Sequence, residues 1–566
     1  MRRLLLTLVL TLTALRLAAA GPAAPDVIYF NGKFVTVDAK GTVASAVAIK
    51  DGKFVAVGNA DGVKKMAGPS TRQVDLGGKL VVPGLVDGHT HPLETARMIA
   101  AWVDCRFPGT PSVKVAMQHI AERAKITPAG GWIFAAASSG SETKFAEHRL
   151  PNKAELDAAA PGHPVILLNG THEFMANSLA LAALGIKKGT ARTKHGAFVQ
   201  LGPDGVPTGD VTEGEADVPD APAVADVTMY YTKVIPETWN AQGFTSVNAI
   251  TQSRFLPVLN AVATSKNAPR RLRFTVPVWT DPAGKFLPAD LTTLAIAKGA
   301  DPAFFRTGGI KAWVDGEVDA RTGFVYQPYC GHFDTDVPGG HGVNNMPQPV
   351  VDAFTQRAND AGLTSMLHCS ADHSTDIALN AYEKLVKSGK PRTNMRIEHF
   401  GVFMVNDDEI KRAKQLGINM SVQPGWLTTL GKSNIENLGE ARAKTGFRFR
   451  SIIEAGLEPS CGTDVTGIYL NLLNPFIHMG ACVDRLSDAG PFVPSEAISV
   501  MDALKMWTIW AARAIGQDDV VGSIEVGKYG DLTVLSDDIF SIPVTAVKTV
   551  KPLKTIVGGN IVYEAK

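Results

Sequence analysis

The chain has 566 residues, which is longer than one ordinary domain and enough to bury a large core. Its composition, with 45% hydrophobic and 20% charged residues, is typical of a globular protein. Lys and Arg total 56 and Asp and Glu total 55, so no net charge favours binding to nucleic acid or to an acidic membrane surface. We therefore expect a small molecule as the partner, and no nucleic acid.

The first 24 residues have the pattern of a signal peptide. Arg2 and Arg3 precede the apolar run LLLTLVLTLTAL, and the small residues of RLAAAGPAAPD follow it. A retained membrane anchor is the alternative, but the run is shorter than the ~20 residues that cross a bilayer, and Arg16 interrupts it. The sequence predicts cleavage after Ala20 or nearby and export to the periplasm or the medium, with no stable membrane span in the mature chain.

Both ends of the remaining chain are rich in β-forming residues and tight turns. Residues 26–38 and 44–58 contain Asn-Gly and Asp-Gly, which are typical of hairpins, and residues 550–564 contain Gly-Gly-Asn. We predict that residues 25–82 and 522–566 together form one small β-sandwich domain.

Short apolar runs alternate with helical patterns between these ends, which indicates a parallel α/β fold. Eight such runs fit a (β/α)8 TIM-like barrel over residues 83–521. An inserted excursion at about residues 102–220 holds two further runs, 131–138 and 163–172. The candidate barrel strands are residues 79–89, 243–250, 271–279, 308–316, 363–369, 394–400, 417–424 and 457–464.

Histidines and an aspartate stand at the ends of several candidate strands. His89 and His91 close the first one and share a face, because alternate strand residues point the same way. Two imidazoles at the C-terminal mouth of a barrel suit a divalent metal such as zinc, although surface histidine pairs are equally common. His368, His399 and Asp464 close later strands. The recurrence favours one metal site built from several strands.

Lys311 is predicted to point into the barrel together with Trp313 and Asp315. A buried ammonium group needs a partner, because burying it unpaired is costly. One solution is an ion pair with Asp315. The other is a reaction of the amine with carbon dioxide, which gives a carbamate able to bridge two metal ions.

The motifs PGLVDGHTHP, IKAWVDG, LHCSAD, RIEHF and CGTD, in this order, resemble the amidohydrolase superfamily. The segments HPVILLNGTHEFMANSLALAALGI, DGVPTGDVTE, SVQPGW and LKMWTIWAARAIG resemble its amidohydrolase-3 branch, which includes N-substituted formamide deformylase. The resemblance covers the chain from about Asp26 to its end. It departs from the branch at HCSAD, which lacks a glycine, and at Thr171, so it leaves the substrate class open.

The resemblance implies two divalent metal ions, with zinc expected, and a CO2-derived carbamate on Lys311 that bridges them. It assigns His89, His91 and Asp464 to one ion and His368 and His399 to the other. A hydroxide shared by the ions would be the nucleophile, and Asp464 would take its proton and pass it to the departing amine.

Further residues are expected around this site. His172 matches a histidine of the branch and is expected to contact the substrate or its oxyanion, with a structural capping role as the alternative. Asn177 is expected near the mouth, and Trp313, Gln423 and Trp426 are expected to bind substrate. Four other histidines are predicted to be surface residues: His332, His341, His373 and His478.

The leading hypothesis is an exported metal-dependent amidohydrolase that cleaves a carbon–nitrogen bond other than a peptide bond. The same site could instead hydrolyse a lactone, a carbamate or an organophosphate ester, or deaminate its substrate. A hypothesis of another class is a non-catalytic periplasmic protein that binds a metal or a solute. The sequence leaves open both a mononuclear site and a homodimer.

Overall fold

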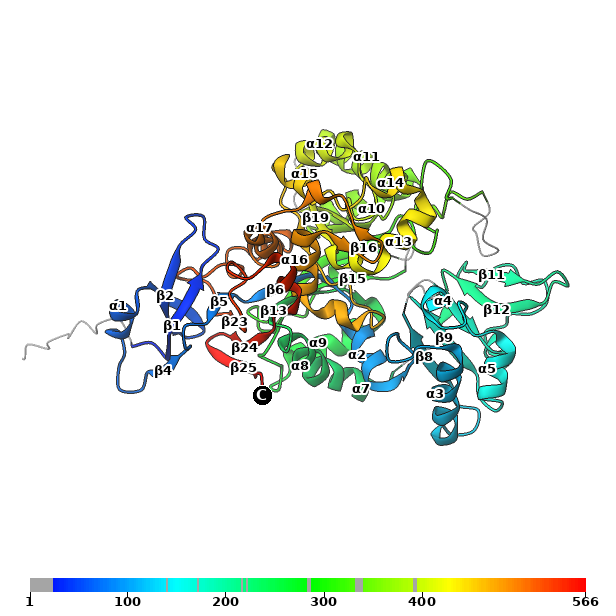
Figure 1. Cartoon of the computed structure of the whole chain (residues 1–566), viewed down its shortest axis with the longest axis horizontal. Coiled ribbons are helices and arrows are strands. Elements are labelled where there is room, and N and C mark those ends of the chain that lie inside the picture. The colour runs from blue at the N-terminus through cyan, green and yellow to red at the C-terminus, as the bar shows by residue number, and fades with distance from the viewer. Residues whose placement is uncertain are drawn as a thin grey trace, which may run out of the picture.

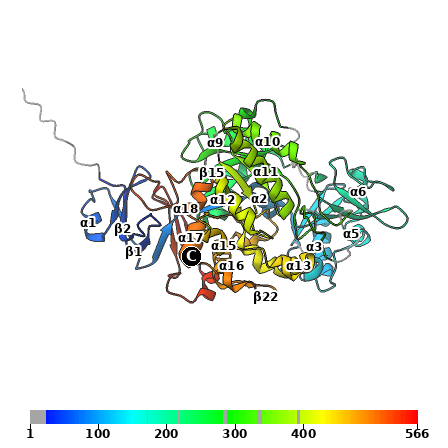
Figure 2. The same ribbon diagram turned by 90° about the horizontal axis from the view of Figure 1, so that it is seen from above.

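The computed structural model describes residues 24–138, 141–170, 173–214, 217–219, 222–281, 287–330, 339–389 and 394–566. The predicted signal peptide up to residue 23 and His172 lie outside the described residues. A central barrel separates a terminal sheet domain, in blue and red, from an inserted domain, in cyan (Figures 1 and 2). Within the described residues, no helix combines the length and the apolar character that crossing a membrane requires.

The terminal sheet domain combines both ends of the described chain. Its strands form one continuous eight-stranded sheet, and strands from the two chain ends are neighbours in it. Side chains from both halves pack into one core, for example Tyr29 and Phe54 against Leu532 and Ile556. In sheet order the strands are β25 (Asn560–Glu564), β24 (Pro552–Val557), β23 (Leu532–Leu535), β5 (Leu80–Pro83), β1 (Val27–Val35), β2 (Val43–Lys50) and β3 (Lys53–Gly58), with β4 (Arg72–Asp75) beside β1 and helix α1 (Ala60–Lys64) following β3.

Gly84 is the point where the chain passes from this sheet into the barrel. Strand β5 ends at Pro83, and the first barrel strand begins at Leu85. A Cβ atom at position 84 would lie 2.2 Å from Thr245 Oγ1, so only glycine fits between the two units.

The barrel contains all eight predicted strands, in chain order. Its first and last strands meet at the mouth, where the backbone N–H of Asp464 donates to the carbonyl oxygen of His89 at 2.8 Å. The strands are β6 (Leu85–Thr90), β13 (Phe244–Ala249), β15 (Arg273–Trp279), β16 (Phe305–Trp313), β17 (Ser365–His368), β18 (Met395–Glu398), β19 (Asn419–Val422) and β20 (Ser460–Cys461), and the short β14 (Thr251–Gln252) pairs with β15.

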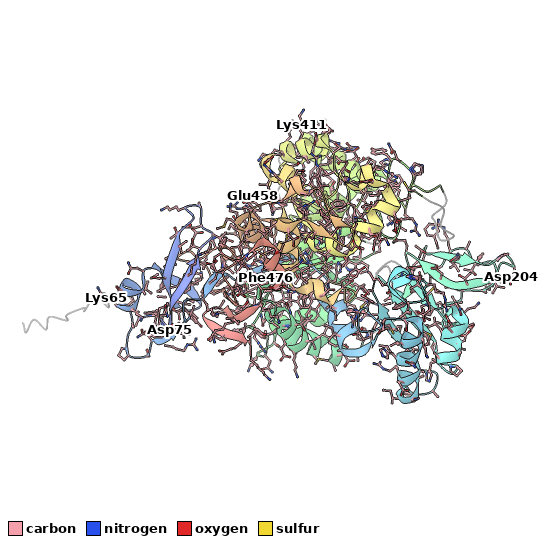
Figure 3. All side chains as sticks on the ribbon, in the orientation of Figure 1. Lys65, Asp75, Asp204, Lys411, Glu458 and Phe476 are labelled. Atoms are coloured by element: carbon pink, nitrogen blue, oxygen red, sulfur yellow. The ribbon has the colours of Figure 1, made fainter. Side chains whose placement is uncertain are left out.

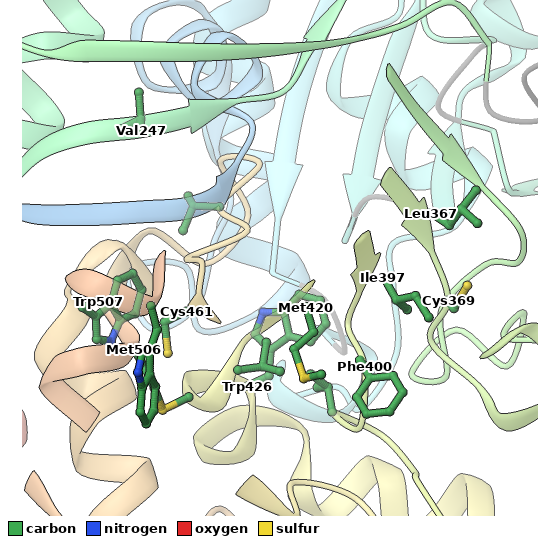
Figure 4. Packing of buried hydrophobic residues seen from close by; sticks show 14 of the residues in the cluster. Val247, Leu367, Cys369, Ile397, Phe400, Met420, Trp426, Cys461, Met506 and Trp507 are labelled. Carbon is green, nitrogen blue, oxygen red and sulfur yellow. The ribbon is translucent and has the colours of Figure 1, made fainter. Parts of the chain in front are cut away.

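Alternate residues of the barrel strands face the surrounding helices. Val247, Leu367, Ile397 and Met420 form part of this apolar layer, which stabilises the barrel (Figure 4). The layer leaves the other face of each strand free for the site. The helices that follow the barrel strands are α2 (Pro92–Ala101), α7 (Val224–Met229), α8 (Ile235–Asn240), α9 (Leu256–Thr264), α10 (Gln348–Asp360), α11 (Asp372–Ser388), α12 (Asp407–Leu416), α13 (Leu427–Leu438), α14 (Glu440–Ala443), α15 (Phe449–Glu454), α16 (Pro475–Asp484), α17 (Val500–Met506) and α18 (Ile509–Ala514).

Helix α12 illustrates how local sequence sets these boundaries. Asn406 and Glu409 form a reciprocal capping box at its start, and Gly417 ends it in the left-handed conformation with φ of 66°. Ile410 and Ala413 form part of its buried face.

The inserted domain has its own six-stranded sheet, separate from the barrel. Side chains show the same division, with Lys65 and Asp75 on the terminal domain and Asp204 at the far end of the insertion (Figure 3). In sheet order its strands are β11 (Phe198–Leu201), β12 (Pro207–Thr212), β10 (Glu173–Ala176), β9 (Val165–Asn169), β8 (Ile133–Ala137) and β7 (Val103–Asp104). Its helices are α3 (Val113–Ile126), α4 (Ser141–Lys144), α5 (Lys153–Ala159) and α6 (Ser178–Ala183).

Candidate metal centre

Two strand ends bring His89, His91 and Asp464 together at the barrel mouth. His89 lies near the end of β6, His91 follows it, and Asp464 follows β20. Oδ1 of Asp464 lies 3.2 Å from Nε2 of His89 and 3.3 Å from Nε2 of His91. Burial would raise the pKa of Asp464, but the neighbouring imidazoles outweigh it and hold this pKa well below its ordinary value. The carboxylate is therefore ionised and available to a cation.

A second group contains His368, His399 and a residue that the sequence did not indicate, Glu317. The His368 and His399 rings lie 4.4 Å apart between centroids, and Nε2 of His368 lies 3.6 Å from Oε1 of Glu317. In each group the potential ligand atoms all lie within 4.8 Å of one another. Imidazole and carboxylate ligands at such separations fit divalent metal ions, so the residues present suit a two-metal site.

Lys311 is buried beside the first of these groups. Its Nζ is 3.5 Å from Nε2 of His89 and 5.0 Å from the centre of the Trp313 ring. Burial lowers the pKa of the amine, against the opposing effect of Glu398 and Asp464.

The ion pair between Lys311 and Asp315, one of the two alternatives from the sequence, does not form. Asp315 instead accepts hydrogen bonds from the backbone N–H of Ser370 at 3.1 Å and from the Ser374 hydroxyl at 2.6 Å. Burial raises the pKa of Asp315 to about 7. This carboxyl group therefore ties the loop after β16 to the start of α11.

Two of the clustered residues have strained backbones. His399 and Asp464 adopt φ of 67° and 48°, in the left-handed region that residues with side chains rarely occupy. Such a conformation costs of order 1 kcal/mol or more and persists where the surrounding structure imposes it. Backbone bonds from His399 N–H to Ser421 O and from Asp464 N–H to His89 O, both 2.8 Å, hold these two turns. The strain indicates that the fold aims both side chains at the cluster.

Comparison with known proteins agrees with this geometry. The sequence profile of the Amidohydrolase family matches residues 72–563. The chain belongs to the amidohydrolase family. N-substituted formamide deformylase from Arthrobacter pascens is 28% identical to this amidohydrolase over 573 residues, which cover 95% of this chain and 98% of the relative.

Other proteins are also similar to this amidohydrolase. LONG AFTER FAR-RED 3 from Arabidopsis thaliana is 28% identical over 570 residues, or 95% of this chain and 91% of the relative. The solved structure of an uncharacterized metal-dependent hydrolase from Pyrococcus horikoshii OT3 superimposes with a TM-score of 0.71 at 24% identity, covering 92% of this chain and 99% of that one. The resemblance found in the motifs is thus confirmed, and this amidohydrolase is a metal-dependent hydrolase with a TIM-like barrel.

Glu398 orients His89 from below the cluster. Its carboxylate accepts from Nδ1 of His89, which leaves Nε2 directed at the site. Arg396, two residues earlier on the same face of β18, donates to Glu398 at 3.0 Å and also to the carbonyl oxygen of Gly88. Burial alone would raise the pKa of Glu398, but the charges of Arg396 and His89 hold it well below its ordinary value. Glu398 is therefore a permanent anion that fixes the tautomer of His89.

Gln423 was predicted to bind substrate, but in the structure it positions the His399 imidazole. It is fully buried, its Oε1 accepts from Nδ1 of His399 at 2.8 Å, and its Nε2 donates to the Ser421 hydroxyl at 3.2 Å. The amide group is thus bonded within the protein at both polar atoms and has no exposed surface for a substrate. Trp426 stacks on His399, with ring centroids 5.4 Å apart, and so supports this imidazole from one side.

Asn177 was expected near the mouth, but its side chain is buried in the inserted domain. Its Oδ1 accepts from the N–H groups of Val165 and Ala180, and its Nδ2 donates to the carbonyl oxygen of His163. It caps helix α6 and joins it to the start of β9. His172, expected to touch the substrate, lies outside the described residues.

His478 was wrongly predicted to be a surface residue. It is fully buried, and burial lowers its pKa to about 4. Its Nδ1 accepts from the N–H of Gly425 at 3.0 Å and its Nε2 donates to the Leu472 carbonyl at 2.8 Å. Of the others, His341 and His373 are half-buried, and His332 lies outside the described residues.

One side of the barrel interior is apolar. Trp279 ends β15 and packs edge-on against Trp313, at 5.1 Å between ring centroids, and both join Ile250 and Met366 in one cluster. Trp313 in turn lies 6.2 Å from the His368 ring. Trp279 and Trp313 therefore form an aromatic wall beside the His368 imidazole.

Sequence reasoning missed Glu317, Glu398 and Arg396. Alternation on β18 could have revealed Arg396 and Glu398, since both share the inward face of that strand. Glu317 lies beyond the end of β16, where alternation no longer applies, so no signal in the sequence marked it.

Proposed function

We propose that this amidohydrolase is exported and hydrolyses a carbon–nitrogen bond of a small molecule. The observation that carries the proposal is the meeting of two potential metal-ligand groups at the barrel mouth. The similarity to N-substituted formamide deformylase over 95% of the chain supports an amide-type bond.

Five strands supply the ligands in this proposal. His89, His91 and Asp464 hold one divalent ion, and His368 and His399 hold the other, with a carboxylated Lys311 between them. Imidazole and carboxylate favour zinc, although other divalent ions also accept them. When bound, such ions lower the pKa of water and polarise the carbonyl group that is attacked.

Lys311 acquires its carboxylate from carbon dioxide. The neutral amine attacks the carbon atom, a nitrogen–carbon bond forms, and one proton leaves to solvent. The buried position, which lowers the pKa of the amine, supports this reaction because it increases the neutral fraction.

Asp464 acts as the proton carrier. Its carboxylate lies at the centre of the cluster, with Oδ2 3.8 Å from Nε2 of His399 and Oδ1 near the other two imidazoles. From this place it takes a proton from the attacking water and passes it to the departing amine. His172 contacts the substrate in this proposal, on the strength of its motif.

The aromatic wall supports a substrate with an apolar group. Trp279 and Trp313 offer a large buried surface, and they carry no charge that would select an ionic substrate. An aryl or alkyl group against this wall would leave the scissile bond facing the histidines.

The test combines metal analysis with substitution of ligands. We expect the purified protein to hold divalent metal and to lose it, together with hydrolysis, in H89A and D464A. H341A, which alters a half-buried histidine outside both ligand groups, is the matched control and should keep both. Full hydrolytic activity in metal-free protein would contradict the proposal.

A panel of chromogenic substrates separates the bond types. Amides, lactones, carbamates and phosphotriesters with the same aryl group should show amide hydrolysis with the highest kcat/KM. A faster ester or deamination reaction would move the assignment to that bond. Tight binding without turnover by the metal-loaded protein would instead favour a binding protein.

Export is tested separately, because it depends on the N-terminal sequence alone. Expression of the full chain should give a mature protein in the periplasm or the medium whose mass corresponds to cleavage near Ala20. Replacing Arg2 and Arg3 by glutamate should retain the precursor in the cytoplasm. A mature protein that still carries residue 1 would refute the cleavage.

A further inference from the structure

Glu317 faces the second pair of imidazoles from the loop after β16. Its side chain is buried, with 7% of the residue exposed, and Oε1 lies 3.6 Å from Nε2 of His368. Together with His399, these residues form a group whose potential ligand atoms all lie within 4.8 Å. The distances place a carboxylate where one more metal ligand would reach.

The loop that carries Glu317 is fixed by its own hydrogen bonds. The N–H of Glu317 donates to the Thr322 hydroxyl at 2.9 Å, and its carbonyl oxygen accepts from the N–H groups of Thr322 and Gly323 at 2.9 and 3.0 Å. Gly316 precedes it, and a Cβ there would lie 2.2 Å from Thr322 Oγ1. The turn is thus closed and tightly packed, which fixes the backbone from which the carboxylate projects before any ligand binds.

Charge balance gives an independent reason for a further carboxylate. Two divalent ions carry more positive charge than Asp464 and a carboxylated Lys311 supply in return. Glu398 does not make up the difference, because Arg396 already neutralises it. Excess charge in a buried site is costly, and Glu317 is a carboxylate placed to reduce it.

We infer that Glu317 is a direct ligand of the second divalent ion, which is then held by His368, His399 and Glu317. The inference rests on the proposed function. With Glu317 as a ligand, the second ion should stay bound even when Lys311 is absent or not carboxylated.

The test uses the full chain and its variants E317Q, K311A and E317Q/K311A. Each is loaded with Zn²⁺ or Co²⁺ in buffer free of bicarbonate and dialysed, and the bound metal is counted by mass spectrometry. The visible spectrum of Co²⁺ reports the ligand set without any reference to activity. E409Q is the matched control, because Glu409 is also a buried glutamate but caps α12, away from both groups.

We expect two ions in the wild type, in K311A and in E409Q, and one in E317Q, with the second ion bound at least ~100-fold more weakly, because a direct ligand should matter more than an outer partner. Added bicarbonate should partly restore the second ion in E317Q but not in the double variant. E317D, whose shorter side chain retracts the carboxylate, should behave like E317Q and serves if E317Q does not fold.

Several outcomes would overturn the inference. Two tightly bound ions with an unchanged Co²⁺ spectrum in E317Q would mean that Glu317 is an outer neighbour of His368. One ion in the wild type and in E317Q alike would remove the second position while leaving a one-metal hydrolase. A wild type that binds no metal at all would refute the proposed function as well.

Discussion

Replacing Glu398 by glutamine should disturb the orientation of His89 and also destabilise the fold. Glutamine keeps the shape of the side chain but removes the charge that Arg396 and His89 share. The loss of an outer carboxylate on a metal-binding histidine typically costs 10–100-fold in metal affinity or activity, or about 1.4–2.8 kcal/mol. Arg396, 1% exposed, also loses its partner, and breaking a buried ion pair costs about 3–5 kcal/mol.

Another buried ion pair offers a control that should lose stability without losing metal affinity. Arg273 and Asp531 form another buried ion pair, with N–O distances of 2.7 and 2.8 Å, and neither residue belongs to the metal-ligand groups. D531N should therefore lose a similar free energy of unfolding while binding metal as the wild type does.

The assay is a metal competition against a chromogenic chelator, together with urea unfolding of the metal-free proteins. We expect E398Q and D531N to be destabilised to a similar extent, and only E398Q to bind metal about 10–100-fold more weakly. Wild-type affinity in E398Q would refute the role of Glu398 in orienting His89. An equal loss of affinity in D531N would show that general destabilisation explains the effect.

Three further predictions concern residues outside the ligand groups. Burial raises the pKa of Glu409 from 4.5 to about 8, so the stability that this residue contributes is full below pH 4.5 and is lost as the pH rises through 8. The urea midpoint of the wild type relative to E409Q should therefore fall over this pH range. A constant difference between the two midpoints would contradict the prediction. N177A should lower the free energy of unfolding by about 1–3 kcal/mol and leave KM unchanged, because Asn177 caps α6. A raised KM would show that Asn177 contacts the substrate after all. H478A should destabilise the fold by about 2–5 kcal/mol, because it leaves a cavity and two unpaired backbone groups. Thermal unfolding measures this loss, and a wild-type Tm would disprove the hydrogen bonds described for His478.

Sequence patterns alone determined the architecture of this protein. Strand runs repeat eight times with room for helices between them, and only the C-terminal mouth of a barrel brings the ends of such strands together. His89, His91, Lys311, His368, His399 and Asp464 were found in this way, because each stands on or just beyond a strand whose alternation is readable.

The tertiary structure decided what surrounds these residues. Glu317 reaches the cluster from an irregular loop, and the partners of Gln423 and Asn177 come from hydrogen bonds that a linear pattern does not encode. His478 is buried only because α16 packs where the loop after β19 needs a hydrogen-bond acceptor. Periodicity specifies which face a side chain takes within a strand, whereas its partners depend on segments that are distant in the chain and meet only after folding.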